Sequence, residues 1–218
     1  MTDRRSYAER CGVALALDLV GERWTLLIVR NLLVGPQRFG ALLKDLPGLT
    51  TNLLTQRLKQ LSLDGIVERD GEGPRAPYAL TARGRALEPV VFALGGWGES
   101  LLMSAPAGHH GNLRWLVLSL RRRYRGDLSL ILELRDGETA FQLRLGTSSA
   151  EILDALKEAP DLVVTGELQA LAMLLAMGRP AQEVLAAGLR LNIAGSRQEL
   201  RRVQRALRIP RSGTAGDD

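Results

Sequence analysis

The stretch TTNLLTQRLKQL, residues 50–61, has the spacing of a short amphipathic helix. Leu54, Leu58 and Leu61 recur at intervals of four and three residues, which places them on one side of an α-helix. Thr50 is a favourable N-cap residue for such a helix. The sequence therefore predicts a helix here with one buried apolar side.

The other side of this predicted helix is polar, and no aspartate or glutamate occurs between positions 46 and 62. Threonine, asparagine, glutamine, arginine and lysine side chains can donate hydrogen bonds to base edges and phosphates, and none of them repels a phosphate. Two interpretations are open on this stretch alone. The helix either contacts DNA or is an ordinary solvent-exposed helix that lacks acids.

The neighbouring segments favour the interpretation that this helix contacts DNA. Apolar spacing predicts three helices before this one, over residues 11–20, 22–34 and 37–46. A helix that follows a short helix and a tight turn has the position of the second helix of a helix-turn-helix. Two strand-like segments follow, at residues 66–69 and 78–80, and the hairpin that they predict would be a wing.

The loop of this hairpin, DGEGPRAP, carries Arg75 near its tip. A narrow minor groove attracts arginine, so we expect Arg75 to reach one; the alternative is a solvent-exposed loop charge. Thr81 is expected to cap a further helix that runs to about Met103 and is weakened by three glycines, at positions 95, 96 and 98.

The residues from Cys11 to Ser100 resemble the winged-helix domain of HxlR-type regulators, relatives of the MarR group. The likeness lies in ALDLVGERWTLLIVRNLL, GPQRFGALLKDLPGLTTNLLTQRLKQLSLDGIVER, YALTARGRAL and GGWGE. It implies a homodimer that represses or activates transcription. It also implies a dimer interface built from the first helix and from the helix after the wing.

The resemblance further implies which residues contact double-stranded DNA. The side of the central helix that faces the groove would carry five of them, and Arg57 would contact a phosphate. A two-fold dimer would read two half-sites roughly one helical turn, ~34 Å, apart. The expected DNA-binding residues are Arg38, Thr50, Thr51, Asn52, Thr55, Gln56, Arg57, Lys59 and Arg75.

Cys11 is the single cysteine, so a disulfide within the chain is impossible. It lies 13 residues before Trp24, a spacing at which many members of the resembled family carry a cysteine, and some members use it as a redox or electrophile sensor. Arg5 and Arg10 would favour its thiolate. The alternative is a small packing residue at the dimer interface.

The second half of the chain has a different pattern. A helix over 113–124 is followed by strand-like segments at 128–134, 141–145, 162–165 and 189–193, and all of these except 162–165 alternate in polarity. This predicts an α+β fold with a small antiparallel sheet and helices segregated on it. The expected organisation is a winged-helix domain at 1–104, a linker at 105–112 that contains His109 and His110, a domain at 113–210 and a polar tail at 211–218.

Residues 167–177 form a predicted helix that is apolar around most of its circumference, so it must be covered on several sides or line a cavity. The region from Asp127 to Leu207 resembles the sterol-carrier-protein-type fold, whose members enclose an apolar tunnel for lipids. Residues 146–160 depart from that family, which usually has a further strand there. The expected pocket residues are Leu132, Phe141, Leu171, Met173, Leu174 and Met177. The alternative is a purely structural domain with a filled interior.

Composition narrows the class of protein. The 218 residues carry a formal net charge of +5, which suits an anionic partner. The chain has no apolar run of the ~18–20 residues that a membrane span needs, and no signal peptide, so we expect a cytoplasmic protein that does not contact membranes. We expect no enzyme, cofactor or metal, because the sequence has no phosphate loop, metal-ligand spacing or Ser/His/Asp set. The combined prediction is a homodimeric transcription regulator that binds an apolar small molecule.

Overall fold

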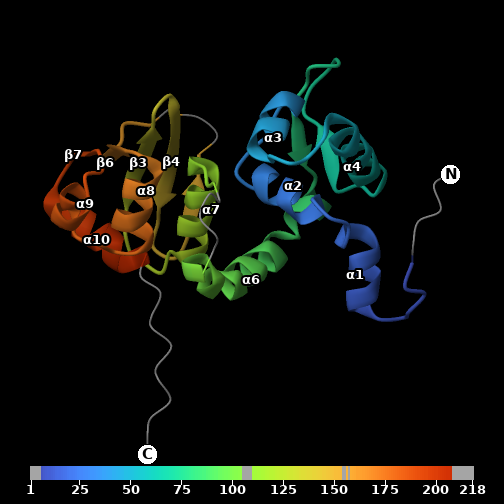
Figure 1. The fold of residues 1–218 in the computed structure, drawn as a ribbon, viewed down its shortest axis with the longest axis horizontal. Coiled ribbons are helices and arrows are strands. Elements are labelled where there is room, and N and C mark those ends of the chain that lie inside the picture. The colour runs from blue at the N-terminus through green and yellow to red at the C-terminus, as the bar shows by residue number, and fades with distance from the viewer. Residues whose placement is uncertain (1–5, 105–109, 154–155, 157, 208–218) are drawn as a thin grey trace, which may run out of the picture. The chain divides into compact units, whose positions relative to one another are not determined.

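The computed structural model in Figure 1 describes residues 6–104, 110–153, 156 and 158–207. The chain divides into two compact units, Met1–Pro106 and Ala107–Asp218, each with its own apolar core. Most of the linker predicted at 105–112 and all of the predicted tail at 211–218 lie outside the described residues.

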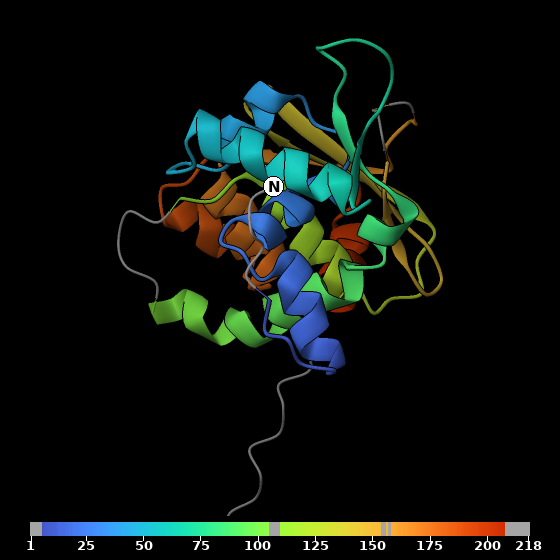
Figure 2. The ribbon, with the colours of Figure 1, turned by 90° about the vertical axis from the view of Figure 1, so that its right-hand side faces the viewer.

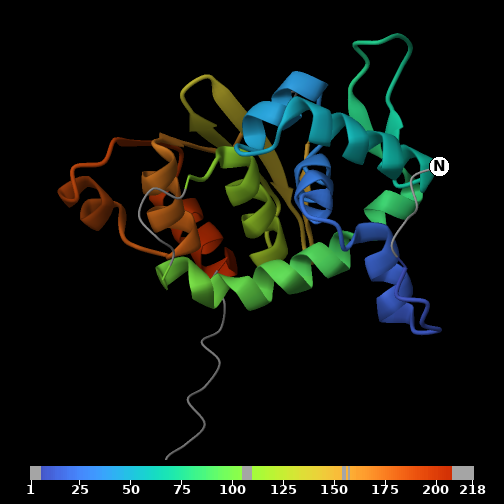
Figure 3. The ribbon, with the colours of Figure 1, turned by 45° about the vertical axis from the view of Figure 1, so that its right-hand side comes forward.

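The first unit is a winged helix-turn-helix. Its central helix, α4, buries its leucine stripe in a core that includes Ile28, Leu42 and Leu80. The wing hairpin projects beyond the helices as a long loop (Figure 3). The elements are α1 (Gly12–Val20), α2 (Thr25–Leu32), α3 (Phe39–Asp45), α4 (Thr51–Leu63), β1 (Val67–Arg69), β2 (Tyr78–Leu80), α5 (Ala82–Arg85), α6 (Glu88–Gly98) and the 3-10 helix η1 (Glu99–Ser104).

Two helices of the first unit begin later than their apolar spacing predicts. Helix α2 was expected from residue 22 but begins at Thr25, because Trp24 has a left-handed backbone with φ of 79°. Helix α3 was expected from Gln37 but begins at Phe39. Gln37 instead forms an isolated β-bridge with Tyr78, in which each backbone amide donates to the other residue's carbonyl, at 2.9 and 2.7 Å.

The single helix predicted from Thr81 to about Met103 is three pieces: α5, α6 and η1. The Oγ1 atom of Thr81 accepts a hydrogen bond from the amide of Gly84 at 3.1 Å and so caps α5 as expected. The next helix then begins anew with Pro89 in its first turn. Proline has no amide proton to continue the hydrogen bonds of a preceding helix but is favourable in a first turn, which accounts for the break between α5 and α6.

The second unit is a five-stranded sheet with helices packed on it. The strand order is β5-β4-β3-β6-β7. Helix α7 packs on β3, β4 and β5, and it also contacts η2 and α10. The elements are α7 (Leu113–Arg123), β3 (Leu130–Asp136), β4 (Thr139–Leu145), β5 (Ala150–Ile152), β6 (Leu162–Gly166), α8 (Leu168–Leu171), the π-helical turn η2 (Ala172–Ala176), α9 (Ala181–Ala186), β7 (Leu191–Ala194) and α10 (Arg197–Leu207).

The sheet differs from the predicted antiparallel one, because β6 pairs with β3 in parallel, with Leu132 opposite Leu162. The chain crosses over after β5 and re-enters the sheet on the free side of β3, and a parallel pair requires such a crossover. The other pairs are antiparallel, including the hairpin at Gly137, where φ is 56°. The short strand β5 also lies within residues 146–160, where no strand was predicted.

Candidate nucleic-acid interface

Helix α4 has one buried side and one exposed side. Leu54, Leu58 and Leu61 are at most 2% exposed. The helix begins where the sequence predicts, since the Oγ1 atom of Thr50 accepts a hydrogen bond from the amide of Leu53 at 3.3 Å. Five expected groove-facing residues are exposed and make up what we call the polar face of α4: Thr51, Asn52, Thr55, Gln56 and Lys59.

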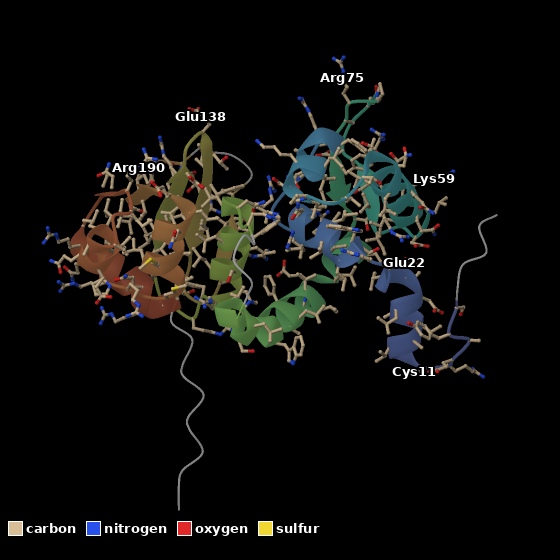
Figure 4. The ribbon with its side chains drawn as sticks, in the orientation of Figure 1. Cys11, Glu22, Lys59, Arg75, Glu138 and Arg190 are labelled. Carbon is tan, nitrogen blue, oxygen red and sulfur yellow. The ribbon has the colours of Figure 1, made fainter. Side chains whose placement is uncertain are left out.

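The polar face combines amide, hydroxyl and ammonium groups. Lys59 extends from α4 on the side away from the core (Figure 4). The Thr55 hydroxyl donates to the carbonyl of Thr51 at 2.9 Å, so its proton is engaged and it presents its methyl group and remaining lone pair. Asparagine and glutamine amides can bind adenine with two hydrogen bonds, and lysine can bind guanine or a phosphate. This combination can both read bases and bind phosphates.

Arg57 lies apart from the polar face. Its Nη2 atom is 2.6 Å from Oε2 of Glu22, and its side chain is only 16% exposed, against 58% for Glu22. The ion pair ties α4 to the segment that joins α1 and α2. The phosphate contact expected for Arg57 would require it to leave Glu22, and in this structure its guanidinium supports the orientation of α4 instead.

Arg38 and Thr50 stand at the starts of two helices. Both residues are exposed, Arg38 directly before α3 and Thr50 directly before α4. Figure 2 views the first unit with α4 in front and the wing extending from it. Both N-cap residues therefore belong to the helix-turn-helix itself, and the Thr50 hydroxyl already caps α4.

The wing carries Arg75 at its far end. The hairpin pairs Arg69 with Tyr78, and a hydrogen bond from the amide of Ala76 to the carbonyl of Gly73, at 3.2 Å, closes a turn around Arg75. Arg75 is exposed and projects from the loop tip (Figure 4). The sequence thus located both the hairpin and the exposed position of this arginine.

Cys11 is an exposed free thiol directly before α1. The backbone amides of Ala14 and then Val13, in the first turn of α1, lower the pKa of its thiol. The sequence suggested Arg5 and Arg10 as the source of this effect, but Arg5 lies outside the described residues and the main causes are the amides at the helix start. A lowered pKa raises the fraction of reactive thiolate.

The residues expected to line a pocket in the second unit mostly fill its core. Leu132, Leu171 and Leu174 are fully buried, while Phe141 and Met173 are half-buried and pack against the same core. Met177, in contrast, is 58% exposed. Five of the six residues therefore belong to one core cluster or pack against it.

A groove lies elsewhere in the second unit, beside the edge strand β7, and we call it the β7 groove. Its volume is about 690 Å³, within the ~300–1,000 Å³ range of small-molecule sites. The Nε atom of Arg190 is 2.8 Å from Oε1 of Glu167 at its margin. No local sequence pattern predicts this groove, because its walls come from separate segments. The lining residues are Asp136, Gly137, Thr165, Gly166, Glu167, Leu185, Leu189, Arg190, Leu191 and Asn192.

Metal and membrane features are absent from the described part of the chain. There, no three residues of the types His, Cys, Asp and Glu are grouped so that they could hold a metal ion. His110 packs against Trp115 with ring centroids 5.8 Å apart, and His109 lies outside the described residues. No described helix is long and apolar enough to cross a membrane.

Comparison with protein families gives a match in the first unit. Residues 19–106 match the HxlR-like helix-turn-helix family. An uncharacterized HTH-type transcriptional regulator of Synechocystis sp. is 42% identical over 95 residues, which cover 42% of this chain and 70% of that relative. Another from Bacillus subtilis is 37% identical over 95 residues, which cover 42% of this chain and 76% of the relative.

Among solved structures, the chain is similar to the redox regulator HypR in its reduced form. The two share 35% sequence identity over 44% of this chain and 100% of the HypR chain, with a TM-score of 0.40. The family match ends at residue 106, where the first unit ends, so any function of the second unit must be argued from its own residues.

Proposed function

The chain belongs to the HxlR-like helix-turn-helix family of transcriptional regulators, and on this premise we propose that α4 enters the major groove of operator DNA. The polar face of α4 is the observation that carries the proposal. It is exposed and free of acids, while the opposite side of the helix is buried. Asn52 and Gln56 read base edges, and Lys59 binds a phosphate or a guanine.

Two further groups complete the proposed interface. Arg75 enters the adjacent minor groove, where narrow A-tracts have an enhanced negative potential. Arg38 and Thr50 contact the phosphate backbone at the margins of the major groove. Arg57 contacts a phosphate only if DNA binding breaks its ion pair with Glu22. We take the DNA-binding domain to span residues 1–104.

We also propose that the regulator is a homodimer built from α1, α6 and η1. Helix α1 exposes Val13, Leu15 and Leu17, which are 67%, 56% and 41% exposed. Exposed apolar groups of this kind favour contact with another protein surface. A second copy that covers them by two-fold symmetry would present two α4 helices to successive turns of DNA.

The second unit, taken as residues 113–210, is proposed to bind an apolar small molecule. The resemblance to sterol-carrier-type domains suggests this role, and the β7 groove is an opening in this unit that is partly lined by apolar side chains, those of Leu185, Leu189 and Leu191. Two alternatives remain as proposals. The filled core favours a purely structural unit, and the lowered pKa of Cys11 favours a thiol signal.

Selection of bound sequences from a random double-stranded DNA pool tests the DNA-binding proposal. We expect enrichment of a two-fold symmetric site whose half-sites are about 10 base pairs apart, and protection of both half-sites in footprinting. The Gln56→Ala variant should lose preference at one base pair in each half-site. Failure to enrich any sequence, or an unchanged preference in Gln56→Ala, would contradict the assignment of the polar face.

Native mass spectrometry of the purified protein tests the proposed effector. A dimer that releases a bound apolar molecule on gentle denaturation would support ligand binding. A dimer that carries nothing, with no thermal shift across fatty acids and sterol-like compounds, would favour the structural alternative for the second unit.

A further inference from the structure

The base of the wing contains an arginine that the proposed interface does not use. Arg69 ends β1 and lies opposite Tyr78 of β2 in the hairpin register. Its guanidinium carbon lies over the Tyr78 ring, 4.7 Å from the ring centre. The Nη2 atom of Arg69 donates a hydrogen bond to the Tyr78 hydroxyl at 2.9 Å. The guanidinium is therefore held against the tyrosine by stacking and by a hydrogen bond.

The same guanidinium reaches two carbonyls of the wing loop. Its Nη1 atom donates to the carbonyl of Pro74 at 3.0 Å and to that of Ala76 at 3.4 Å. These two residues are the neighbours of Arg75 on either side. Since the amide of Ala76 donates to the carbonyl of Gly73, Arg75 occupies the third position of a β-turn whose backbone Arg69 contacts directly.

Tyr78 connects this arrangement to the helix-turn-helix. Its backbone forms two hydrogen bonds with Gln37, at 2.9 and 2.7 Å, and Gln37 directly precedes Arg38 at the start of α3. The Gln37 side chain also donates to Asp45 of α3 at 2.8 Å. The contacts therefore run without interruption from the loop around Arg75, through Arg69 and Tyr78, to α3.

Without the contacts of Arg69, the composition of the wing loop would allow it many conformations. Gly71 and Gly73 have positive φ values of 104° and 91° and occupy a region of backbone space that glycine enters freely. Ordering such a loop only when DNA binds would cost conformational entropy, and contacts that order it beforehand reduce that cost.

We propose that Arg69 is a positioning residue, which holds the wing loop in the conformation that presents Arg75 to the minor groove. The proposal rests on the proposed function of Arg75. It differs from a direct role for Arg69 in binding phosphate, because all its described contacts are with Tyr78 and with loop carbonyls.

The Arg69→Lys variant separates these two roles. Lysine keeps the positive charge but is a point charge on a flexible stem, and it lacks the planar fork that stacks on a ring and contacts several acceptors at once. A phosphate contact would survive this substitution, whereas the positioning role would be lost. Arg85→Lys, at an exposed residue of α5 outside the wing, is the matched control.

Amide hydrogen exchange of the free protein tests the positioning role without DNA. We expect exchange at the Ala76 amide to become faster in Arg69→Lys and Arg69→Ala, with exchange in α4 unchanged and with no change in Arg85→Lys. Tyr78→Phe, which removes only the hydroxyl acceptor, should give an intermediate effect. Unchanged exchange at Ala76 in all Arg69 variants would overturn the proposal, whatever the DNA experiments give.

A double-mutant cycle on the selected operator tests the consequence. Arg69→Lys should weaken binding by about tenfold in the wild-type background and by less than about twofold when Arg75 is already alanine, because coupled residues are not additive. Equal losses in both backgrounds would mean that Arg69 acts independently of Arg75 and would overturn the proposal. If Arg75→Ala itself binds normally, the minor-groove role of Arg75 fails, while the exchange measurement still decides whether Arg69 orders the loop.

Discussion

Helices α4 and α6 belong to the same unit but expose opposite kinds of surface. Helix α4 buries three leucines and exposes polar groups without acids. None of the described residues of α6 is buried, and it exposes Leu94 and Trp97, at 49% and 75%. An acid-free polar surface suits a polyanion, whereas an exposed apolar surface suits another protein. The difference fits the proposal that one small domain carries a DNA interface and a dimer interface with different chemistry.

The largest effect should come from the buried side of α4. Leu58→Ala should lower the free energy of unfolding of the first unit by about 2–5 kcal/mol, because it leaves a cavity at a residue that is 1% exposed. Leu94→Ala on α6 should change it by less than about 0.5 kcal/mol in monomeric protein. Urea denaturation at low protein concentration measures the free energy of unfolding of both variants. Equal losses in the two variants would contradict the expected difference between α4 and α6.

The exposed side of α6 should matter for association instead. Trp97→Asp should raise the dimer dissociation constant by about thirtyfold or more, because a charge would be placed in an apolar interface centred on an aromatic residue. Sedimentation equilibrium measures the change, with Trp97→Phe as the control that keeps an apolar ring. A Trp97→Asp protein that remains fully dimeric would exclude this surface as the interface.

The polar face of α4 should act at single base pairs. Gln56→Ala should cost about 1–3 kcal/mol at the base pair that Gln56 reads and should relax specificity only there. Binding to operators substituted at each position reports the effect. A uniform loss across all sequences would instead make Gln56 a backbone contact.

Lys59 should give a smaller and less selective effect. Lys59→Ala should weaken binding similarly on all sequences and should reduce the slope of log affinity against log salt by about 1. Titrations at several salt concentrations measure the slope. An unchanged slope would show that Lys59 does not bind a phosphate, and Lys44→Ala, on α3, serves as a charge-matched control.

The subtlest effect concerns Cys11 at the start of α1. Since the amides of Ala14 and Val13 lower its pKa, the pH midpoint of its alkylation by iodoacetamide should lie below that of the unfolded chain. The sign follows because the amides stabilise the thiolate only while α1 is folded, so reactivity near neutral pH should fall in urea. Equal midpoints in the folded and unfolded states would contradict this.

Much of the first unit could be predicted from the sequence, because its signals are local. The spacing of Leu54, Leu58 and Leu61 predicted the buried side of α4, and the polar loop between residues 69 and 78 predicted the wing. The start of α2 could not be predicted, because the left-handed backbone of Trp24 depends on surrounding packing. Arg57 also required the structure, since Glu22 is 35 residues away in the chain.

In the second unit, local sequence patterns predict strands but not how the strands pair. Alternation predicted β3, β4 and β7, and a short apolar run predicted β6. Neither signal says which strands pair, and the parallel pairing of β3 with β6 is decided by long-range contacts. The same limit applies to the pocket. The apolar helix pattern predicted that Leu171 and Leu174 share one apolar environment. Only packing determines whether such residues line a cavity or fill a core, and here both are buried in the core.

Local patterns in the chain specify a helix-turn-helix with a wing, an acid-free polar face on α4 and an α+β second unit, because periodicity, caps and turns act over a few residues. Tertiary structure alone decides which polar groups stay exposed. It also places Arg69 between Tyr78 and the carbonyls beside Arg75, and it forms the groove beside β7. These features depend on contacts between segments that no local pattern relates, and they are set by close packing of the whole unit.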